Sequence, residues 1–539
     1  MNARIRHVAL LASIVALAPA SAQRIEPLPF DSDQPAAPPE TLGQAIAEAY
    51  RSNPSLEGQR AQLRALDEQI VQAGSPYRLN AGITMSLQYR SQEQRGLLGT
   101  FDTDRARTMG ATLNVSQILL NGGRTAAQVS AAEATVLAGR ERLREAENAV
   151  LFEVVDAYVS VRRDQALVAI QQRSLASYGR QLTQAVARER GGDLTRTDIA
   201  QARAQREIIR AQLAQATANL QASRGRFATV VGRNPGNLLV PPTLPGLPTS
   251  LDAAFIVAER ESPSVGQAIL ATRVGDARIA AQRAERAPIV ALTGSYGYAS
   301  PYSYQLRDTG PQAAGGVTLT MPLLTGGVVG SRIRAAVAER QQLGFEVETA
   351  RRAALAITQN AWNQAVAAGE QMDAGRVATE AAEAALTGVQ RGFAEGFRSN
   401  FEVLDSEQRL LTAQLVFVNA TYAAYAAEAR LLATLGRLQA AAIAQAVPTY
   451  DPARNTRQVR KATFAPLDPV LGAVDRAQMP SGAGKPAPAI PVATDTRLRP
   501  ALVTALPGPI GRALPITPVP VLVGPSAADL ADTRVTGGF

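Results

Sequence analysis

VSQILLNGG, residues 115–123, is a stretch in which a short strand pattern runs through a glycine pair into a long helical pattern. LTMPLLTGG, residues 319–327, repeats this arrangement 204 residues later. Around these two stretches, residues 110–232 align with residues 314–436 at the same offset and without a gap. Self-similarity of this extent is the mark of an internal duplication. We therefore expect two copies of one strand–helix unit.

Each copy contains two segments in which apolar and polar residues alternate, and this pattern predicts strands with one apolar and one polar face. Such strands belong either to a half-buried soluble sheet or to a membrane barrel, where the apolar face meets lipid. Four strands cannot close a barrel, and open edges in lipid leave backbone groups without partners. Membrane strands would therefore require an oligomer. The apolar positions are Ala81, Ile83, Met85, Leu87, Tyr89, Met109, Ala111, Leu113, Val115, Val290, Leu292, Tyr296, Tyr298, Val317, Leu319 and Met321.

A long helix is predicted in each copy, over residues 124–190 and 328–394, because neither range contains proline. A helix of this length spans roughly 100 Å. Its apolar residues follow two series with a spacing of seven, four residues apart, as the a and d positions of a coiled coil do. A bundle of packed long helices is therefore expected. The predicted hinge turns that stop these helices lie at Gly191, Gly192, Gly392 and Gly396.

The ends of the chain differ in character from the repeats. Residues 1–22 have the basic start, apolar stretch and small-residue cleavage pattern of a signal peptide. A Pro-rich linker is expected over 23–40, repeat 1 over 41–249 and repeat 2 over 250–445. Residues 446–539 are Pro-rich, and we expect them to be mostly disordered, with short packed pieces near their start.

The composition excludes several kinds of site. The chain has no cysteine, and its single histidine, His7, lies in the predicted signal peptide. The mature chain therefore cannot form a Cys or His metal site, a disulfide or a nucleophile–histidine pair. No cofactor and no enzymatic activity are expected. The net charge of +9 comes from basic residues scattered among acidic ones, so no nucleic-acid partner is predicted.

The order of these features resembles the TolC family of bacterial outer-membrane export channels over residues 41–440. Its most specific parts are the two glycine turns, GGDLTRTDIAQARAQ at 191–205 and EGFRSNFEVLDSEQRLLTAQ at 395–414, followed by LLATLGRL at 431–438. The resemblance implies a mainly α protein with a transmembrane β-barrel, in which an internally duplicated protomer forms a homotrimer. Twelve strands would form the barrel in the outer membrane lipid, continued by a periplasmic α-helical coiled-coil barrel.

The resemblance also implies a function. The chain would conduct cargo passively from an inner-membrane ABC transporter, or an RND pump, and a periplasmic adaptor (membrane fusion) protein to the cell exterior. The sequence TRTDIAQA is most similar to that of family members that serve type I secretion. The alternative within transport is an outlet for multidrug or metal efflux. An alternative of another class is a periplasmic coiled-coil scaffold or adaptor without a pore.

Residues at the glycine turns match functional positions of that family. Glu402 and Asp405 fall where the family places carboxylates at its pore constriction, and threefold symmetry would gather six of them. Arg398 and Asp198 match a network that holds the tip closed, while Phe393 stands where a tyrosine is usual and lacks its hydroxyl. The alternative for the acids is a solvated helix surface. The alternative for Arg398 and Asp198 is that they merely cap or bridge neighbouring helices.

Overall fold

The protein is described by a computed structural model that places residues 39–95, 101–192, 194–444, 450–462 and 468–478. The predicted signal peptide and most of the predicted linker lie outside these described residues. So do most residues of the predicted C-terminal tail.

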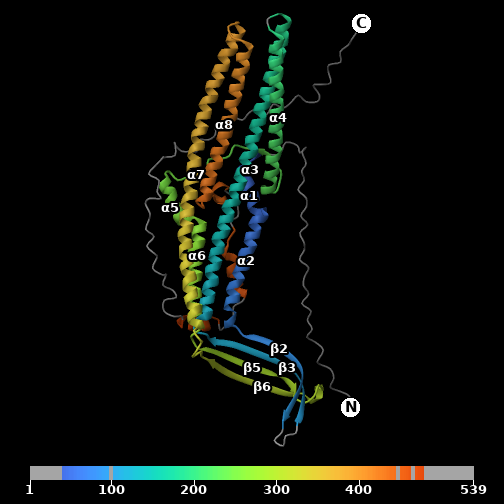
Figure 1. Ribbon diagram of the computed structural model, residues 1–539, viewed down its shortest axis with the longest axis vertical. Coiled ribbons are helices and arrows are strands. Elements are labelled where there is room, and N and C mark those ends of the chain that lie inside the picture. Colours follow the sequence, from blue (N-terminus) through green and yellow to red (C-terminus); the bar gives the residue numbers. More distant parts are fainter. Residues whose placement is uncertain (1–38, 96–100, 193, 445–449, 463–467, 479–539) are drawn as a thin grey trace, which may run out of the picture.

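Two helices of equal length organise the molecule (Figure 1). α3, Arg124–Arg190, and α7, Val328–Ala394, each contain 67 residues. The prediction of two long helices is confirmed, and at 1.5 Å per residue each is about 100 Å long. The spacing of seven is borne out along α3, because Val136, Leu143 and Val161 are all buried.

Shorter helices pair with the two long ones at either end of the bundle. Away from the sheet, α4, Arg196–Val231, packs along α3, and α8, Asn400–Thr434, packs along α7. Towards the sheet, α2, Pro54–Gly74, packs along α3, and α6, Pro263–Ala284, lies between α3 and α7. Each long helix therefore changes partner along its length.

Four of the strands form an antiparallel sheet at the end of the bundle, in the order β2-β3-β5-β6. These strands are β2, Asn80–Arg95; β3, Phe101–Leu120; β5, Ile289–Ser300; and β6, Gly310–Thr320. The register sets apolar residues opposite one another, since Ile83 faces Leu113 and Leu113 faces Tyr296. The two strand pairs of the duplication therefore join into one sheet.

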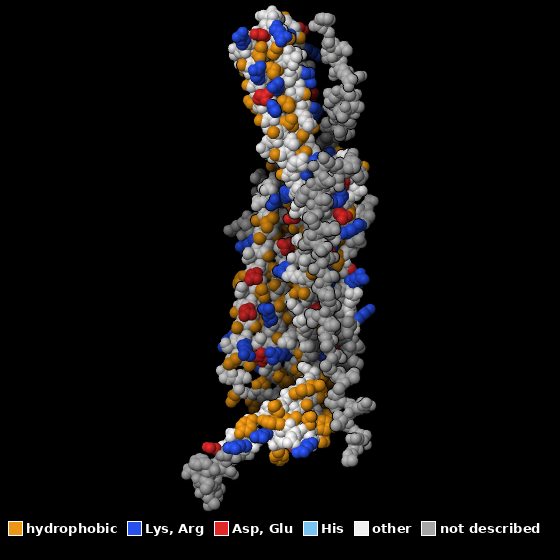
Figure 2. Space-filling model, turned by 90° about the vertical axis from the view of Figure 1, so that its right-hand side faces the viewer, with side chains coloured by type: hydrophobic (Ala, Val, Ile, Leu, Met, Phe, Trp, Pro, Cys, Tyr) orange, Lys and Arg blue, Asp and Glu red, His pale blue; other side chains and the backbone are white. Residues whose placement is uncertain are grey.

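Most side chains on the apolar face of this sheet are exposed in the described protomer. On its apolar face Met85 is 79% exposed and Leu319 is 66% exposed. Figure 2 shows hydrophobic side chains gathered on the sheet. The polar face carries Thr84, whose hydroxyl accepts a hydrogen bond from Asn114 Nδ2 at 3.1 Å. A soluble half-buried sheet would bury its apolar face, so this arrangement favours a membrane sheet.

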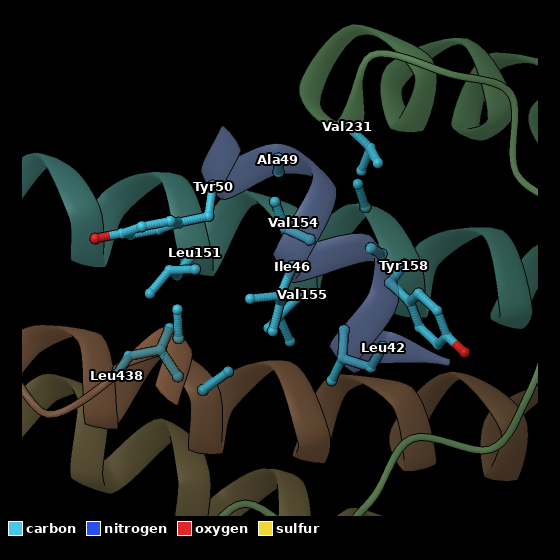
Figure 3. Close-up of a cluster of buried hydrophobic side chains, with 14 of the residues drawn as sticks. Leu42, Ile46, Ala49, Tyr50, Leu151, Val154, Val155, Tyr158, Val231 and Leu438 are labelled. Carbon is cyan, nitrogen blue, oxygen red and sulfur yellow. The ribbon is translucent and has the colours of Figure 1, made fainter. Parts of the chain in front are cut away.

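A belt of small elements surrounds the middle of the bundle. α1, Leu42–Ser52, presents Leu42 and Ile46 to Val154, Val155 and neighbouring residues of α3 in the main hydrophobic core (Figure 3). α5, Leu251–Glu261, packs on α7 as the second copy of α1. The remaining elements are β1, Pro39–Glu40, which pairs with β4, Asn237–Leu238, and the short α9, Ala440–Ile443.

Two further helices follow the repeats and break their symmetry. α10, Ala453–Ala462, and α11, Asp468–Ala477, pack against α2 and α3 respectively. We refer to residues 450–462 and 468–478 as the C-terminal strap. Both helices lie near the start of 446–539, the part of the tail in which short packed pieces are expected. Residues 479–539 lie outside the described residues.

Candidate functional site

The first glycine turn joins α3 to α4 at the end of the bundle far from the sheet. Gly192 adopts a left-handed φ of 88°, which glycine tolerates without a Cβ clash. Thr195 and Asp198 then form a capping box at the start of α4. The Thr195 hydroxyl donates to Asp198 Oδ2 at 2.7 Å, and the Thr195 backbone N–H donates to the same oxygen at 3.0 Å. These hydrogen bonds hold the pKa of Asp198 below its usual range.

The second glycine turn repeats this construction between α7 and α8. Gly396 has a left-handed φ of 86°, and Ser399 forms a capping box with Glu402. Gly392 lies inside the last turn of α7 rather than in the turn itself, which corrects its predicted place as a helix stop. Its carbonyl accepts hydrogen bonds from the N–H groups of Phe397 and Arg398 at 2.8 and 3.2 Å. A Cβ at position 392 would meet Arg398 Cγ at 2.8 Å, so glycine lets Arg398 pack there.

Phe393 connects the two turns through an arginine that sequence reasoning missed. The guanidinium carbon of Arg188, in the last turn of α3, lies 4.4 Å from the centroid of the Phe393 ring. This distance is within the range of a cation–π interaction. Repeat 1 has Arg188 where repeat 2 has Gly392, and this difference between the copies was the available signal. Phe393, which lacks the hydroxyl of a tyrosine, therefore makes a cation–π contact with Arg188 instead of a hydrogen bond.

Glu402 and Asp405 lie one helical turn apart near the start of α8, and both are partly exposed. Each carboxylate has an arginine four residues away. Arg398 Nη1 lies 3.5 Å from Glu402 Oε1, and Arg409 Nη2 lies 2.9 Å from Asp405 Oδ2. The predicted acidic pair is therefore flanked by two arginines, each paired with one of the acids. The sequence analysis had not considered Arg409.

The structure brings Arg398 to Glu402 but does not bring Arg398 to Asp198. Among the described residues, Asp198 bonds with Thr195 and makes no ion pair within 4 Å. The two turns are instead tied together below the tips by Glu407, which is buried on α8. Ser177 Oγ of α3 donates to Glu407 Oε1 at 2.9 Å. Burial raises the pKa of Glu407.

Other kinds of site receive no support from the described part of the chain. It contains no group of three or more His, Cys, Asp or Glu side chains that could hold a metal ion. α8 is long and apolar enough by composition to cross a membrane. It nevertheless packs along α7 within the bundle and carries Glu402 and Asp405 near its start.

Comparison with known proteins gives a consistent result. The chain matches the family described as outer membrane efflux protein over residues 45–233 and 257–437. It is 31% identical over 425 residues to the outer membrane efflux protein BepC of Brucella suis, covering 79% of this chain and 91% of BepC. It is 24% identical over 395 residues to the outer membrane protein TolC of Salmonella enteritidis, covering 71% and 79% of the two chains. Among solved structures, VceC of Vibrio cholerae aligns with a TM-score of 0.62 at 22% identity, covering 73% of this chain and 96% of VceC.

Proposed function

The chain belongs to the outer membrane efflux protein family, and from this premise we propose that it is the passive outlet of a type I secretion system. The family has the TolC-type fold predicted from the sequence, and its members are outer-membrane channels of tripartite export systems. The chain is therefore an outer-membrane transport protein rather than an enzyme. Membership of a channel family also argues against a scaffold without a pore.

The observation that carries the channel function is the sheet at the end of the bundle. β2 and β6 each pair on one side only, and the apolar residues of all four strands share one exposed face. In lipid, the free edges require pairing with another chain. Three protomers joined edge to edge would close a twelve-stranded barrel, with lipid against the apolar face and water inside. The α3 and α7 helices would continue that opening for about 100 Å.

The helix tips would form the gate of this channel. Threefold symmetry would gather six carboxylates from Glu402 and Asp405, with six guanidinium groups from Arg398 and Arg409 beside them. We expect this ring to attract cations less strongly than six unpaired acids would, because each acid has a basic neighbour. Arg398, Asp198 and the Arg188–Phe393 contact would hold the turns in place. Opening would draw the α3–α4 and α7–α8 hairpins apart at Gly192 and Gly396.

The first turn supports protein secretion as the kind of transport, because TRTDIAQA at 195–202 resembles secretion members of the TolC family. An adaptor and an inner-membrane ABC transporter would then dock at the tips. The second candidate is an outlet for drug or metal efflux, with an RND pump in place of the ABC transporter. It is favoured by the similarity to BepC, an outer membrane efflux protein.

Two experiments test this proposal. The purified protein should be a trimer that dissociates on heating, and it should conduct ions in planar bilayers. A soluble monomer that does not conduct would refute the channel function. Quantitative proteomics of the culture medium should then compare a deletion strain with the complemented strain. Loss of one or a few large extracellular proteins is expected for secretion, whereas an unchanged medium with increased drug or metal sensitivity would favour efflux.

The constriction has its own test. Replacing both acids, Glu402→Ala with Asp405→Ala, should raise conductance and weaken block by multivalent cations. An unchanged conductance and an unchanged block would contradict the proposed ring.

A further inference from the structure

The two copies of the duplication differ at one ion pair in the middle of the bundle. In repeat 1, Arg226 Nη1 on α4 lies 2.8 Å from Asp156 Oδ2 on α3. The offset of 204 places Asn360 and Arg430 at the equivalent positions of α7 and α8. The carboxylate has thus been replaced by an amide of the same shape, while the arginine is retained. Repeat 2 therefore has an arginine without its counter-ion.

Arg430 takes a different contact in place of that ion pair. Its guanidinium carbon lies 5.9 Å from the centroid of the Phe152 ring, which comes from α3 of the other repeat. Within the described ranges, no carboxylate lies within 4 Å of Arg430. Phe152 is itself absent from repeat 2, where Ala356 is the equivalent residue. The side chain of Arg430 is exposed, so its charge is available to a ligand.

Phe152 and Arg430 stand together between two adjoining pockets. One pocket has a volume of about 380 Å³ and is also lined by Tyr422. The other has a volume of about 330 Å³ and is lined by Ile357. Each volume is at the lower end of the range for small-molecule sites. The shared wall offers one aromatic face and the guanidinium of Arg430. The linings also contain two carboxylates that have other partners, since Asp156 pairs with Arg226 and Glu145 accepts a hydrogen bond from Gln267.

These pockets lie on the same side of α8 as the acids of the tip. Arg430 follows Glu402 by 28 residues, which is four heptads, so the two side chains share one face of a coiled-coil helix. The opposite face of α8 is filled by the hydrophobic core, which contains Tyr425, Ala429 and residues of α1. If the tip acids face the tunnel, Arg430 therefore faces it about 42 Å further along.

We propose that the Phe152–Arg430 pocket is a tunnel subsite that binds small amphipathic carboxylates. The guanidinium would pair with the carboxylate, and the Phe152 ring and neighbouring apolar side chains would contact the hydrocarbon part. Three such sites would ring the tunnel in a trimer. Arg226, the equivalent of Arg430 in repeat 1, does not form a second carboxylate site, because it is already paired with Asp156. The proposal rests on the proposed channel function, which decides that this face lines a conduit.

The test uses the purified full-length trimer and 1-naphthoate as the probe. Equilibrium binding is measured by the fluorescence of the probe, and block of single-channel conductance is measured in bilayers. Arg430→Gln should weaken binding about tenfold or more, as expected from loss of a charge-assisted hydrogen bond. Asn360→Asp should weaken it similarly, because it restores the ion pair of repeat 1 and draws the guanidinium away from Phe152.

Two controls make the result specific. Arg376→Gln removes an exposed arginine of α7 that pairs with Glu380, and it should bind 1-naphthoate like the wild type. The cation 1-naphthylmethylammonium should bind much more weakly than 1-naphthoate. Equal binding of the two probes, or wild-type affinity in both pocket variants, would overturn the proposal.

The two readouts separate this proposal from the channel function. A trimer that conducts without Arg430-dependent binding would refute the pocket alone. A protein that binds 1-naphthoate through Arg430 but never conducts would refute the channel function, and with it the role of the pocket in transport.

Discussion

Phe393 illustrates at the scale of single residues how a missing hydroxyl is replaced. The ring offers no hydrogen bond, and the structure instead sets the Arg188 guanidinium 4.4 Å from its centroid. A cation–π contact at a partly exposed site contributes about 0.5–1 kcal/mol. This small contribution counts three times in a trimer. A closed tip held by such contacts should open more readily than one held by buried ion pairs.

Phe393→Leu should therefore favour the open tip. Loss of about 0.5–1 kcal/mol per protomer shifts the balance between closed and open states roughly two- to fivefold for each contact. The expected result is a higher open probability in single-channel recordings. The matched control is Phe397→Leu, because Phe397 belongs to the same turn and is 81% exposed. Equal effects of the two substitutions would argue against a role for the Arg188 contact.

Glu428 is a buried residue whose charge should make stability depend on pH. Its side chain lies among apolar residues of α8, and burial raises its pKa to about 8. Because this value exceeds the ordinary pKa of about 4.3, the folded state holds a proton that the unfolded state releases. Its contribution is therefore fully present below about pH 4.3 and is lost as the pH rises through 8.

Glu428→Gln should remove this part of the pH dependence. The melting temperature of the wild type, followed by the fluorescence of the single tryptophan, Trp362, should fall relative to the variant between pH 5 and 9. Trp362 is buried in α7 and so reports on the helical core. The difference at pH 9 should correspond to about 5 kcal/mol. Parallel pH profiles of the two proteins would contradict this explanation.

At the scale of elements, the C-terminal strap supplies a cap for α3 from outside the repeats. α3 begins after Gly123, which has no side chain to bond the first N–H groups. Asp475 of α11 fills this role, since its carboxylate accepts from Gly123 N at 2.7 Å and from Ala126 N at 3.0 Å. The Tyr77 hydroxyl donates to the same carboxylate at 2.8 Å. A negative charge here also suits the helix dipole.

Asp475→Ala should loosen the strap and the first turn of α3 together. Loss of an N-terminal cap costs about 1–2 kcal/mol. We expect hydrogen exchange at the amides of Gly123 and Ala126 to accelerate about five- to thirtyfold. Asp451→Ala is the control, because Asp451 lies on the exposed part of the strap and bonds within it. Unchanged exchange in Asp475→Ala would show that the cap is not needed.

The elements themselves were largely predictable from the sequence. The duplication, the proline-free stretch 124–190 and the alternation from Ile83 to Tyr89 each gave the correct element, because periodicity reports directly on packing. The packing of the strap could not be predicted in detail, since α10 has few apolar residues and is held by polar contacts. Asn455 Nδ2 and Thr456 Oγ1 both donate to the buried Asp67. Contacts between residues nearly 400 positions apart leave no local pattern.

The candidate site was less predictable than the fold. Periodicity placed Glu402 and Asp405 on one turn of α8, but the pairing of Asp405 with Arg409 depends on rotamers. Asp198 and Glu402 both proved to be capping residues, which the spacing from Thr195 and Ser399 could have indicated. The difference between the repeats marked Arg188, but its contact with Phe393 could not be assigned, because it depends on tertiary packing of the two long helices.

At the scale of the whole molecule, the two unpaired sheet edges determine the assembly. Closure of the barrel requires β6 of one protomer to pair with β2 of the next, and this contact can be trapped because the chain has no cysteine. Four double variants test this contact. Each combines Thr84→Cys on β2 with a cysteine at one of four positions of β6 that lie on the same face of the sheet as Thr84. Oxidation should produce covalent trimers for at least one of these registers. The four positions are Gln312, Ala314, Gly316 and Thr318.

Single-cysteine variants serve as the control and should remain uncross-linked beyond dimers. If none of the four pairs gives covalent trimers in outer-membrane fractions, the barrel is not closed by these edges.

The open edges of the sheet also have a genetic consequence. A subunit that retains β2 and β6 but carries a defective tip still enters the barrel. One such subunit can abolish transport by the trimer that it joins. When defective and normal subunits are made in equal amounts and mix freely, only about one assembly in eight contains three normal copies. Tip mutations should therefore be dominant over the wild-type gene. Mutations that destroy an edge should be recessive, because their products never join the ring.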